Sequence, residues 1–314
     1  MKEKDRRYRT TIGGQALIEG ILMRGPEKQA IVVRTKDGLV VRQEEIKLSK
    51  EKYPFLGWPF IRGIVNFAGS MANGVKALMF SAQCLPEEEQ EAEKSRLDRW
   101  IEKRFDDEKA EKLIVTIALI IGLSMSIVLF MLLPTLLAGL FDGLIKSRIV
   151  INLLEGAIRI TIFLIYLWLA TRMKDVHRVF EYHGGEHKSI HCYEKGLELT
   201  VENVRLQPRQ HPRCGTSFLF VVIIISTLVF SLVRWSNPLM RMLFRLLLLP
   251  VVVAISYEIN RFAGRHDNLF TRIITAPGLA LQRLTVFEPD DGMIEVAIKG
   301  LELVIPEKEG SDKW

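Results

Sequence analysis

Four long apolar runs interrupt this chain of 314 residues. A bilayer core of roughly 30 Å needs about 20 apolar residues per helix, and each run is close to that length. Two runs carry no charge, the second contains Glu155 and Arg159, and the last contains Pro250, which should kink a helix. The pattern predicts four membrane-spanning helices, at Leu113–Leu133, Ile149–Thr171, Ser217–Val233 and Met240–Ile259.

Two features of these runs leave alternatives open. Residues 134–145 are apolar but too short to span, so they either extend the first helix or re-enter the membrane. Glu155 and Arg159 are four residues apart and share a helix face. Inside a bilayer such a pair is less costly when it faces protein or water, but a solvated helix start fits the same positions.

Before the first span, the spacing of apolar residues along the chain changes twice. Within the N-terminal β segment, residues 1–54, apolar and polar side chains alternate over Ile12–Leu48 around Asp37-Gly38, which predicts a β-hairpin. Residues 55–84 repeat apolar side chains at helical spacing and predict an amphipathic helix at the membrane interface. Residues 85–112 are rich in both signs of charge and predict a solvated linker helix.

The C-terminal segment, residues 261–314, alternates again around Pro289–Gly292, which predicts a second pair of strands. Because a lone hairpin is marginal in water, the two strand pairs are expected to join. The glycine-rich stretch 13–26 is expected to form a tight turn that docks on the bundle, or to offer backbone amides to an anion. The predicted fold is therefore mainly α. It is a polytopic membrane helix bundle over residues 113–260, with about four spans plus the amphipathic interfacial helix, and a small cytoplasmic β-rich domain formed by N- and C-terminal strands.

Composition supports a membrane protein with large water-exposed parts. Hydrophobic residues make up 48% of the chain and the mean hydropathy is +0.16, yet 25% of the residues are charged. The net charge is +6 and the basic residues flank the apolar runs, so the expected partner is an anionic lipid bilayer rather than nucleic acid. These residues concentrate before the first span, in a loop at 172–216 and after the fourth span. That bias predicts that both termini and the loop are cytoplasmic.

One short motif in this loop carries candidate chemistry. The run His183–His187 reads H-x-x-E-H, and His191 follows at the same spacing of four. On a helix the three imidazoles would share one face. Two histidines one turn apart are typical zinc ligands, and the intervening Glu186 is placed as an acid/base.

A metal site needs at least one more ligand than two histidines. Three candidates lie at the same predicted membrane boundary: Glu258 at the end of the fourth span, and His211 and Cys214 just before the third. The three cysteines of the chain are odd in number and widely spaced, which fits a reducing compartment or one metal thiolate. The ion would be Zn²⁺ or another divalent metal. In the alternative interpretation, the histidines bond only to phosphates, backbone carbonyls or Glu186.

Together these motifs resemble those of the YqhQ family of uncharacterised bacterial membrane proteins. The matching segments are spread over nearly the whole chain, at 13–26, 59–64, 183–194, 211–218 and 256–258. The family is described as predicted metal-dependent enzymes, and the resemblance implies a multi-pass protein of the bacterial cell membrane. It points to the same site residues, His183, Glu186, His187, His211, Cys214 and Glu258. The glycine pair 184–185 and the membrane setting depart from the zinc peptidase pattern.

Two functional hypotheses follow from these residues. The first is a cytoplasm-facing, membrane-embedded metalloenzyme, a hydrolase that acts on a lipid-linked or membrane-peptide substrate. The second is a non-enzymatic membrane factor that binds another membrane protein, the protein-translocation machinery or lipid, with a structural His/Glu/Cys cluster. Transport ranks third, because the bundle is small and shows no internal repeat.

Overall fold

A computed structural model describes residues 9–46, 53–86, 95–141, 143–231, 238–266, 268–308 and 310–313. The chain divides into two compact units. Unit 1 combines three stretches of the chain, Met1–Cys84, Leu167–Ile225 and Leu249–Trp314. Unit 2 combines Leu85–Tyr166 and Ser226–Leu248.

A four-stranded antiparallel sheet lies in unit 1, and its strands pair in chain order. The predicted hairpin around Asp37-Gly38 is confirmed, and Gly38 has a φ of 127°, which favours glycine. The glycine-rich stretch 13–26 forms a second hairpin rather than an isolated turn. The strands are β1 (Gly13–Leu17), β2 (Gly20–Arg24), β3 (Lys28–Thr35) and β4 (Gly38–Glu45).

The C-terminal segment is helical, so the predicted second pair of strands was wrong. It forms α12 (Leu269–Thr285) and α13 (Asp291–Glu302). Asp290 is the N-cap of α13, and its carboxylate accepts a hydrogen bond of 2.8 Å from the amide of Met293. The expected union of the two ends does occur, but as a helix on a sheet. Buried side chains of α13 share one core with β2 and β3: Met293, Val296, Ala297 and Leu301 with Ile21, Met23, Ala30 and Val32.

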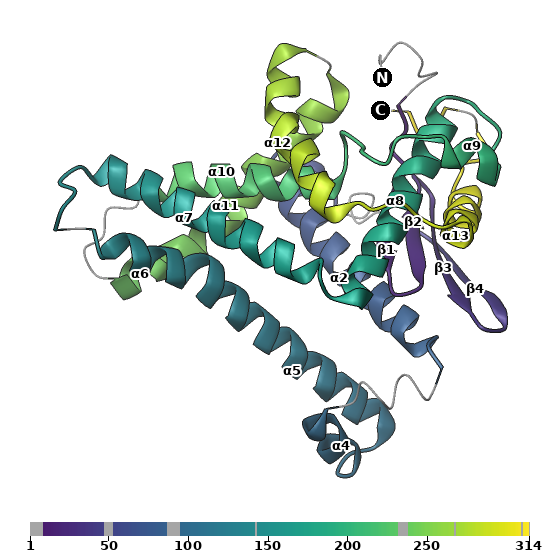
Figure 1. Cartoon of the computed structure of the whole chain (residues 1–314), viewed down its shortest axis with the longest axis horizontal. Coiled ribbons are helices and arrows are strands. Elements are labelled where there is room, and N and C mark those ends of the chain that lie inside the picture. The colour runs from purple at the N-terminus through teal and green to yellow at the C-terminus, as the bar shows by residue number, and fades with distance from the viewer. Residues whose placement is uncertain are drawn as a thin grey trace. The chain divides into compact units, whose positions relative to one another are not determined.

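The predicted loop at 172–216 is mostly helix. It contains α8 (Lys174–Glu194) and the short α9 (Val201–Arg205). Helix α8 packs against α13, β1 and β2, and its Tyr182 is fully buried in the core that these elements share (Figure 1). The motif therefore sits on a rigid, buried helix rather than on a mobile connection.

The predicted amphipathic helix is α2 (Ile61–Gln83), which follows the 3₁₀ turn η2 (Pro54–Gly57). Its buried positions are small, and the Cα of Gly63 faces Tyr257 so closely that a methyl group would lie 2.9 Å from the Tyr257 Cβ. Larger apolar side chains remain exposed along the helix, namely Ile61, Ile64, Phe67, Met71 and Leu78. Placement of this face on a membrane stays a prediction.

Three helical stretches are long and apolar enough to cross a membrane: Lys112–Gly139, Ile149–Ala170 and Met242–Arg265. The first combines α5 (Asp107–Ile127), the π-helical turn η3 (Val128–Leu132) and α6 (Leu133–Gly139), so residues 134–139 extend the first predicted span. The others belong to α7 (Arg148–Ala170) and α11 (Pro238–Arg265). Helix α10 (Gly215–Ser231) is apolar but shorter, and its role as a fourth span stays a prediction. Within the charged stretch 85–112, the described residues form α4 (Arg96–Glu102) and the start of α5.

Candidate metal centre

Helix α8 places the motif in the interior of unit 1 because its two glycines allow neighbouring backbone to approach. A methyl group on Gly184 would lie 2.0 Å from the carbonyl oxygen of Phe287, just after α12. One on Gly185 would lie 3.3 Å from the carbonyl oxygen of Met293 in α13. Packing thus requires glycine at position 184, although the pair weakens an isolated helix, and leaves little room at position 185.

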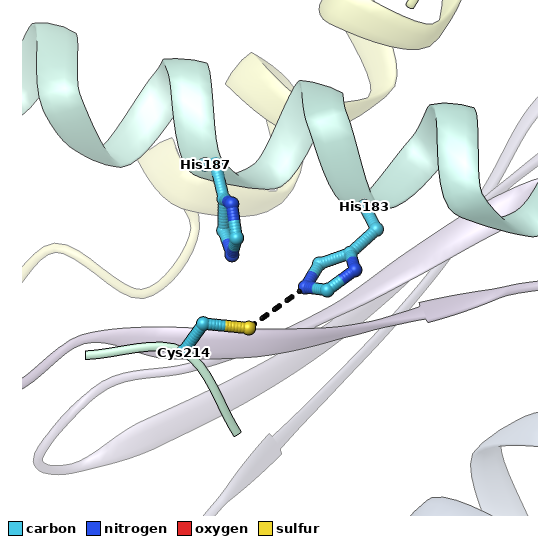
Figure 2. A group of neighbouring side chains, drawn as sticks. All are labelled: His183, His187 and Cys214. Atoms are coloured by element: carbon cyan, nitrogen blue, oxygen red, sulfur yellow. Dashed lines mark hydrogen bonds between the residues drawn. The ribbon is translucent and has the colours of Figure 1, made fainter. Parts of the chain in front are cut away.

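The structure brings three of the predicted ligands together. The nearest donor atoms of His183, His187 and Cys214 all lie within 4.8 Å of one another. Nε2 of His183 is 3.1 Å from Sγ of Cys214, and the His187 ring lies beside them on the same helix face (Figure 2). His187 and Cys214 are buried, and His183 is half-buried.

Backbone carbonyls orient both imidazoles. Nδ1 of His183 is 3.0 Å from the carbonyl oxygen of Thr285, and Nδ1 of His187 is 2.6 Å from that of Arg209. A carbonyl oxygen can only accept, so each Nδ1 carries the hydrogen and donates it. In the neutral ring Nε2 then holds the free lone pair, which is the arrangement of metal-binding histidines.

Cys214 lies in the turn that precedes α10, and the neighbouring Thr216 contacts its sulfur. The backbone amide and the hydroxyl of Thr216 donate to Sγ over 3.5 and 3.3 Å. These two contacts, together with that to His183, fix the position of the sulfur. The turn is held by Gln282 of α12, which exchanges two hydrogen bonds of 2.8 Å with the backbone of His211.

A second group on α8 has a different chemistry. Donor atoms of His191, Glu194 and His211 also lie within 4.8 Å of one another, and all three residues are buried. However, the Arg213 guanidinium donates to the Glu194 carboxylate and lies 3.4 Å from Nε2 of His211. The backbone amide of Thr10 donates to the same carboxylate over 2.9 Å. This group already contains a cation, which repels a metal ion at the same position.

Two predicted site residues lie outside both groups. The buried Glu186 carboxylate accepts a 2.8 Å hydrogen bond from the amide of Gly14 in β1. Burial raises the pKa of Glu186, while the nearby His183 and the Gly14 amide oppose that rise. Glu258 pairs instead with Arg62 of α2, over 2.8 Å between Oε1 and Nε. Glu258 therefore does not complete the first group.

Sequence reasoning missed several residues that shape the site. Glu194 could have been found, because it lies eleven residues after His183 and so returns to the same face of α8. Arg213 stands next to Cys214 in the sequence but gave no signal of its own. The carbonyls of Thr285 and Arg209 have no signature, since any residue type carries one.

Comparisons with known proteins point to one family. The family model described as "Protein of unknown function (DUF1385)" matches residues 58–307. The chain is also 34% identical over 294 residues to "Uncharacterized protein YqhQ" of Bacillus subtilis (strain 168), covering 91% of this chain and 90% of that protein. No solved structure matches the chain significantly. The matched region includes all the candidate ligands, but the matching family has no described function. The arrangement of the ligands is therefore the main indication of function.

Proposed function

We propose that this chain, which belongs to the DUF1385 family of proteins of unknown function, is a membrane-embedded, metal-dependent enzyme. The proposed reaction is hydrolysis of a lipid-linked or membrane-peptide substrate at a site that faces the cytoplasm. The observation that carries the proposal is the pair of Nδ1–carbonyl hydrogen bonds, which leaves Nε2 of His183 and of His187 for a ligand beside Cys214.

The donor set of the first group suits Zn²⁺. Two imidazoles and one thiolate are its usual protein ligands, and three protein ligands are typical of catalytic zinc sites, which keep one position for substrate or water. A divalent metal bound there supplies Lewis acidity, which polarises a scissile carbonyl or phosphoryl group. His191 and His211, both predicted ligands, then belong to the hydrogen-bonded second group that supports the site.

Glu186 is the proposed acid/base. It precedes His187 on α8, and the Gly14 amide holds its carboxylate in one orientation inside a buried environment. A carboxylate held in this way can accept a proton from an attacking water and pass it to the leaving group. The role of Gly14 is positioning, because it acts through Glu186.

A membrane substrate is supported by the position of the site along the chain. Helix α8 begins a few residues after the span that ends at Ala170, and Cys214 directly precedes the apolar helix α10. The ligands are therefore tied to chain segments that enter or leave the apolar part. The basic residues around them support a cytoplasmic orientation.

A second candidate function has its own observation. Glu186 accepts a hydrogen bond from Gly14, and Glu194 accepts one from Arg213. Carboxylates with such partners would also be expected in a purely structural cluster. The protein would then be a non-enzymatic membrane factor that binds another membrane protein, the translocation machinery or lipid. Any metal would only fasten α8 to the turn at Cys214.

Elemental analysis of the purified full chain tests the metal site. The wild type is expected to hold about one zinc or other divalent ion per chain, and His183→Ala and Cys214→Ser to lose it. His266→Ala is the matched control, because among the described contacts the ring of His266 meets only Phe262 of its own helix. Absence of stoichiometric metal from the wild type would contradict the proposed metal-dependent function.

The Glu186→Gln variant separates the two functions. An enzyme is expected to retain its metal in this variant and to behave in cells like a deletion, because the acid/base is gone. A fully functional Glu186→Gln variant with metal bound would exclude Glu186 as an essential acid/base and favour the binding factor.

A further inference from the structure

A second cluster of buried charges lies in unit 2, inside the apolar stretches. Glu155 and Arg159 belong to α7 and Arg245 to α11, and their exposed fractions are 3%, 5% and 3%. All three lie within stretches that are long and apolar enough to cross a membrane. Charges at such positions are costly and mark functional sites more often than structural ones.

The Glu155 carboxylate is saturated by its neighbours. Oε1 accepts from Nη2 of Arg159 at 2.9 Å, from Nη1 of Arg245 at 2.5 Å and from the Thr135 hydroxyl at 3.0 Å. Oε2 accepts from Nη2 of Arg245 at 2.9 Å. The Arg245 guanidinium thus donates to the carboxylate through both terminal nitrogens. Glu155 and Arg245 alone therefore form a bidentate ion pair with no net charge.

The second arginine leaves the cluster with an excess positive charge. Two guanidinium groups face one carboxylate, and the other described hydrogen-bond partners of Arg159 are neutral: the Phe130 carbonyl at 2.9 Å and the Ser226 hydroxyl at 3.4 Å. The Phe230 ring lies 5.5 Å from each guanidinium carbon and attracts both, but it carries no net charge. Among the described residues, this cluster offers no second carboxylate.

The cluster also has an unused donor. Nε of Arg245 is buried and has no hydrogen-bond acceptor among the described residues. A buried N–H without an acceptor is unfavourable, so such groups usually meet water or an ion. The excess charge of the cluster and the orphaned donor of Arg245 both call for an anion.

A small cavity lies against these groups. Both arginines line it, and it has room for about one particle of the size of a water molecule or a halide ion. The side-chain amide of Asn152 also lines it; one of its two N–H groups donates to the Ser231 carbonyl over 3.4 Å, which leaves the other able to donate to an anion. The lining residues are Asn152, Glu155, Gly156, Arg159, Thr227, Phe230, Ser231 and Arg245.

We infer that this cavity binds a small monovalent anion, of the class of chloride or bromide, held by Arg159 and Arg245. The anion neutralises the charge that Glu155 leaves uncompensated, and the size of the cavity excludes carboxylates and phosphates. The inference is independent of the metal site, which uses residues of unit 1.

The test is the melting temperature of the purified full chain in detergent without phospholipid. Sodium chloride or bromide is titrated against sodium gluconate at constant ionic strength. The halide is expected to raise the melting temperature by roughly 2 °C at tenfold excess over its dissociation constant, and the rise should follow saturable binding. An unchanged melting temperature, or a rise that never departs from linearity with concentration, overturns the inference.

Two variants remove the need for the anion in different ways. Arg159→Gln removes the excess charge and leaves the Glu155–Arg245 pair intact. Asn152→Asp adds a carboxylate to the cavity lining. Both are expected to lose the halide response, whereas Arg62→Gln, which breaks the Arg62–Glu258 pair in unit 1, should keep it. A halide response that survives in both cavity variants overturns the assignment.

A lipid source of the negative charge is distinguished in the same assay. Phosphatidylglycerol is added to the gluconate sample. Stabilisation by this lipid in the absence of any halide effect would show that the cluster binds a lipid phosphate, and would overturn the inference of a free small anion.

Discussion

The two backbone carbonyls that hold His183 and His187 decide the chemistry of the candidate site. Each carbonyl accepts a hydrogen bond from the Nδ1 of one imidazole. Nε2 of each ring therefore remains on the side of the Cys214 sulfur. The second group uses the same residue types but includes the Arg213 cation. Identical donors can therefore form a metal site or a hydrogen-bonded network, and the neighbouring charge separates them.

At the scale of residues, the sequence predicted which side chains form the first group but also included residues that bind elsewhere. His183, His187 and Cys214 do meet, because the spacing of four on a helix and the position before α10 were both readable. Glu258 was proposed only from its place at the predicted membrane boundary, and its actual partner, Arg62, comes from a distant helix. Contacts between segments far apart in the chain leave no trace in local spacing.

Gly184 and Gly185 give a matched pair of substitutions. Gly184→Ala is expected to destabilise the protein by about 1–3 kcal/mol, because its new methyl group meets the fixed Phe287 carbonyl oxygen at 2.0 Å. Gly185→Ala is its control: the nearest atom is 3.3 Å away and alanine favours a helix by about 1 kcal/mol. Thermal unfolding of both variants measures the difference. Equal melting temperatures would mean that the backbone at Phe287 yields readily.

Cys192 supplies a pH-dependent prediction. Burial raises the pKa of its thiol above the ordinary value, with Lys195 acting in the opposite direction. The folded state thus favours the neutral thiol, and this stabilisation is complete below the ordinary thiol pKa and is lost as pH rises through the folded value. The wild type should lose stability more steeply above about pH 9 than Cys192→Ala. Parallel slopes for the two proteins in thermal unfolding between pH 8 and 10 would contradict this.

At the scale of elements, the period of the apolar positions was informative for the sheet and misleading for α13. In Met293–Val304, the positions 294, 296 and 298 alternate as in a strand, while 293, 296, 297, 300, 301 and 304 repeat as in a helix. The tertiary structure selects the helical set, which lies against the sheet. Asp290, taken as a turn residue, is the N-cap, and the same residue type favours both roles.

The packing of α13 on the sheet predicts where the unit is sensitive. Leu301 is fully buried in this core, so Leu301→Ala is expected to cost about 2–5 kcal/mol through lost apolar contact and a residual cavity. Lys299→Ala, two residues earlier on the solvent side, should change stability by less than about 0.5 kcal/mol. If both variants melt together, α13 contributes little to the fold of unit 1. Thermal melts in one detergent give the comparison.

At the scale of the whole molecule, composition and hydropathy predicted a membrane protein, and three helical stretches meet the requirements for crossing a bilayer. The division into two units could not be predicted, because unit 1 draws on three separate stretches of the chain. Each stretch alone looks like a terminal segment or a loop. Only their shared core reveals that they fold as one body.

The proposed cytoplasmic orientation of unit 1 can be tested by introduced cysteines. Cys192 and Cys214 are buried and so report poorly on topology, whereas Leu206 and Leu144 are 82% and 80% exposed. In whole cells, an impermeant maleimide is expected to spare Leu206→Cys and to label Leu144→Cys, which follows the first span. The reverse pattern would invert the proposed topology and place the candidate metal centre outside the cell.

The meeting of the two chain ends has a consequence for biosynthesis. The backbone amide of Thr10 donates a hydrogen bond to Glu194 of α8, and Thr10 also forms an isolated β-bridge with Lys313. A chain emerging from the ribosome makes the sheet first, then α8, and only later α12 and α13. Until α12 has been synthesised, His183 of α8 lacks the carbonyl of Thr285 that orients its ring. Loading of the proposed metal site is therefore expected only after α12 has been made, and a nascent chain arrested before residue 285 should be unable to capture the ion.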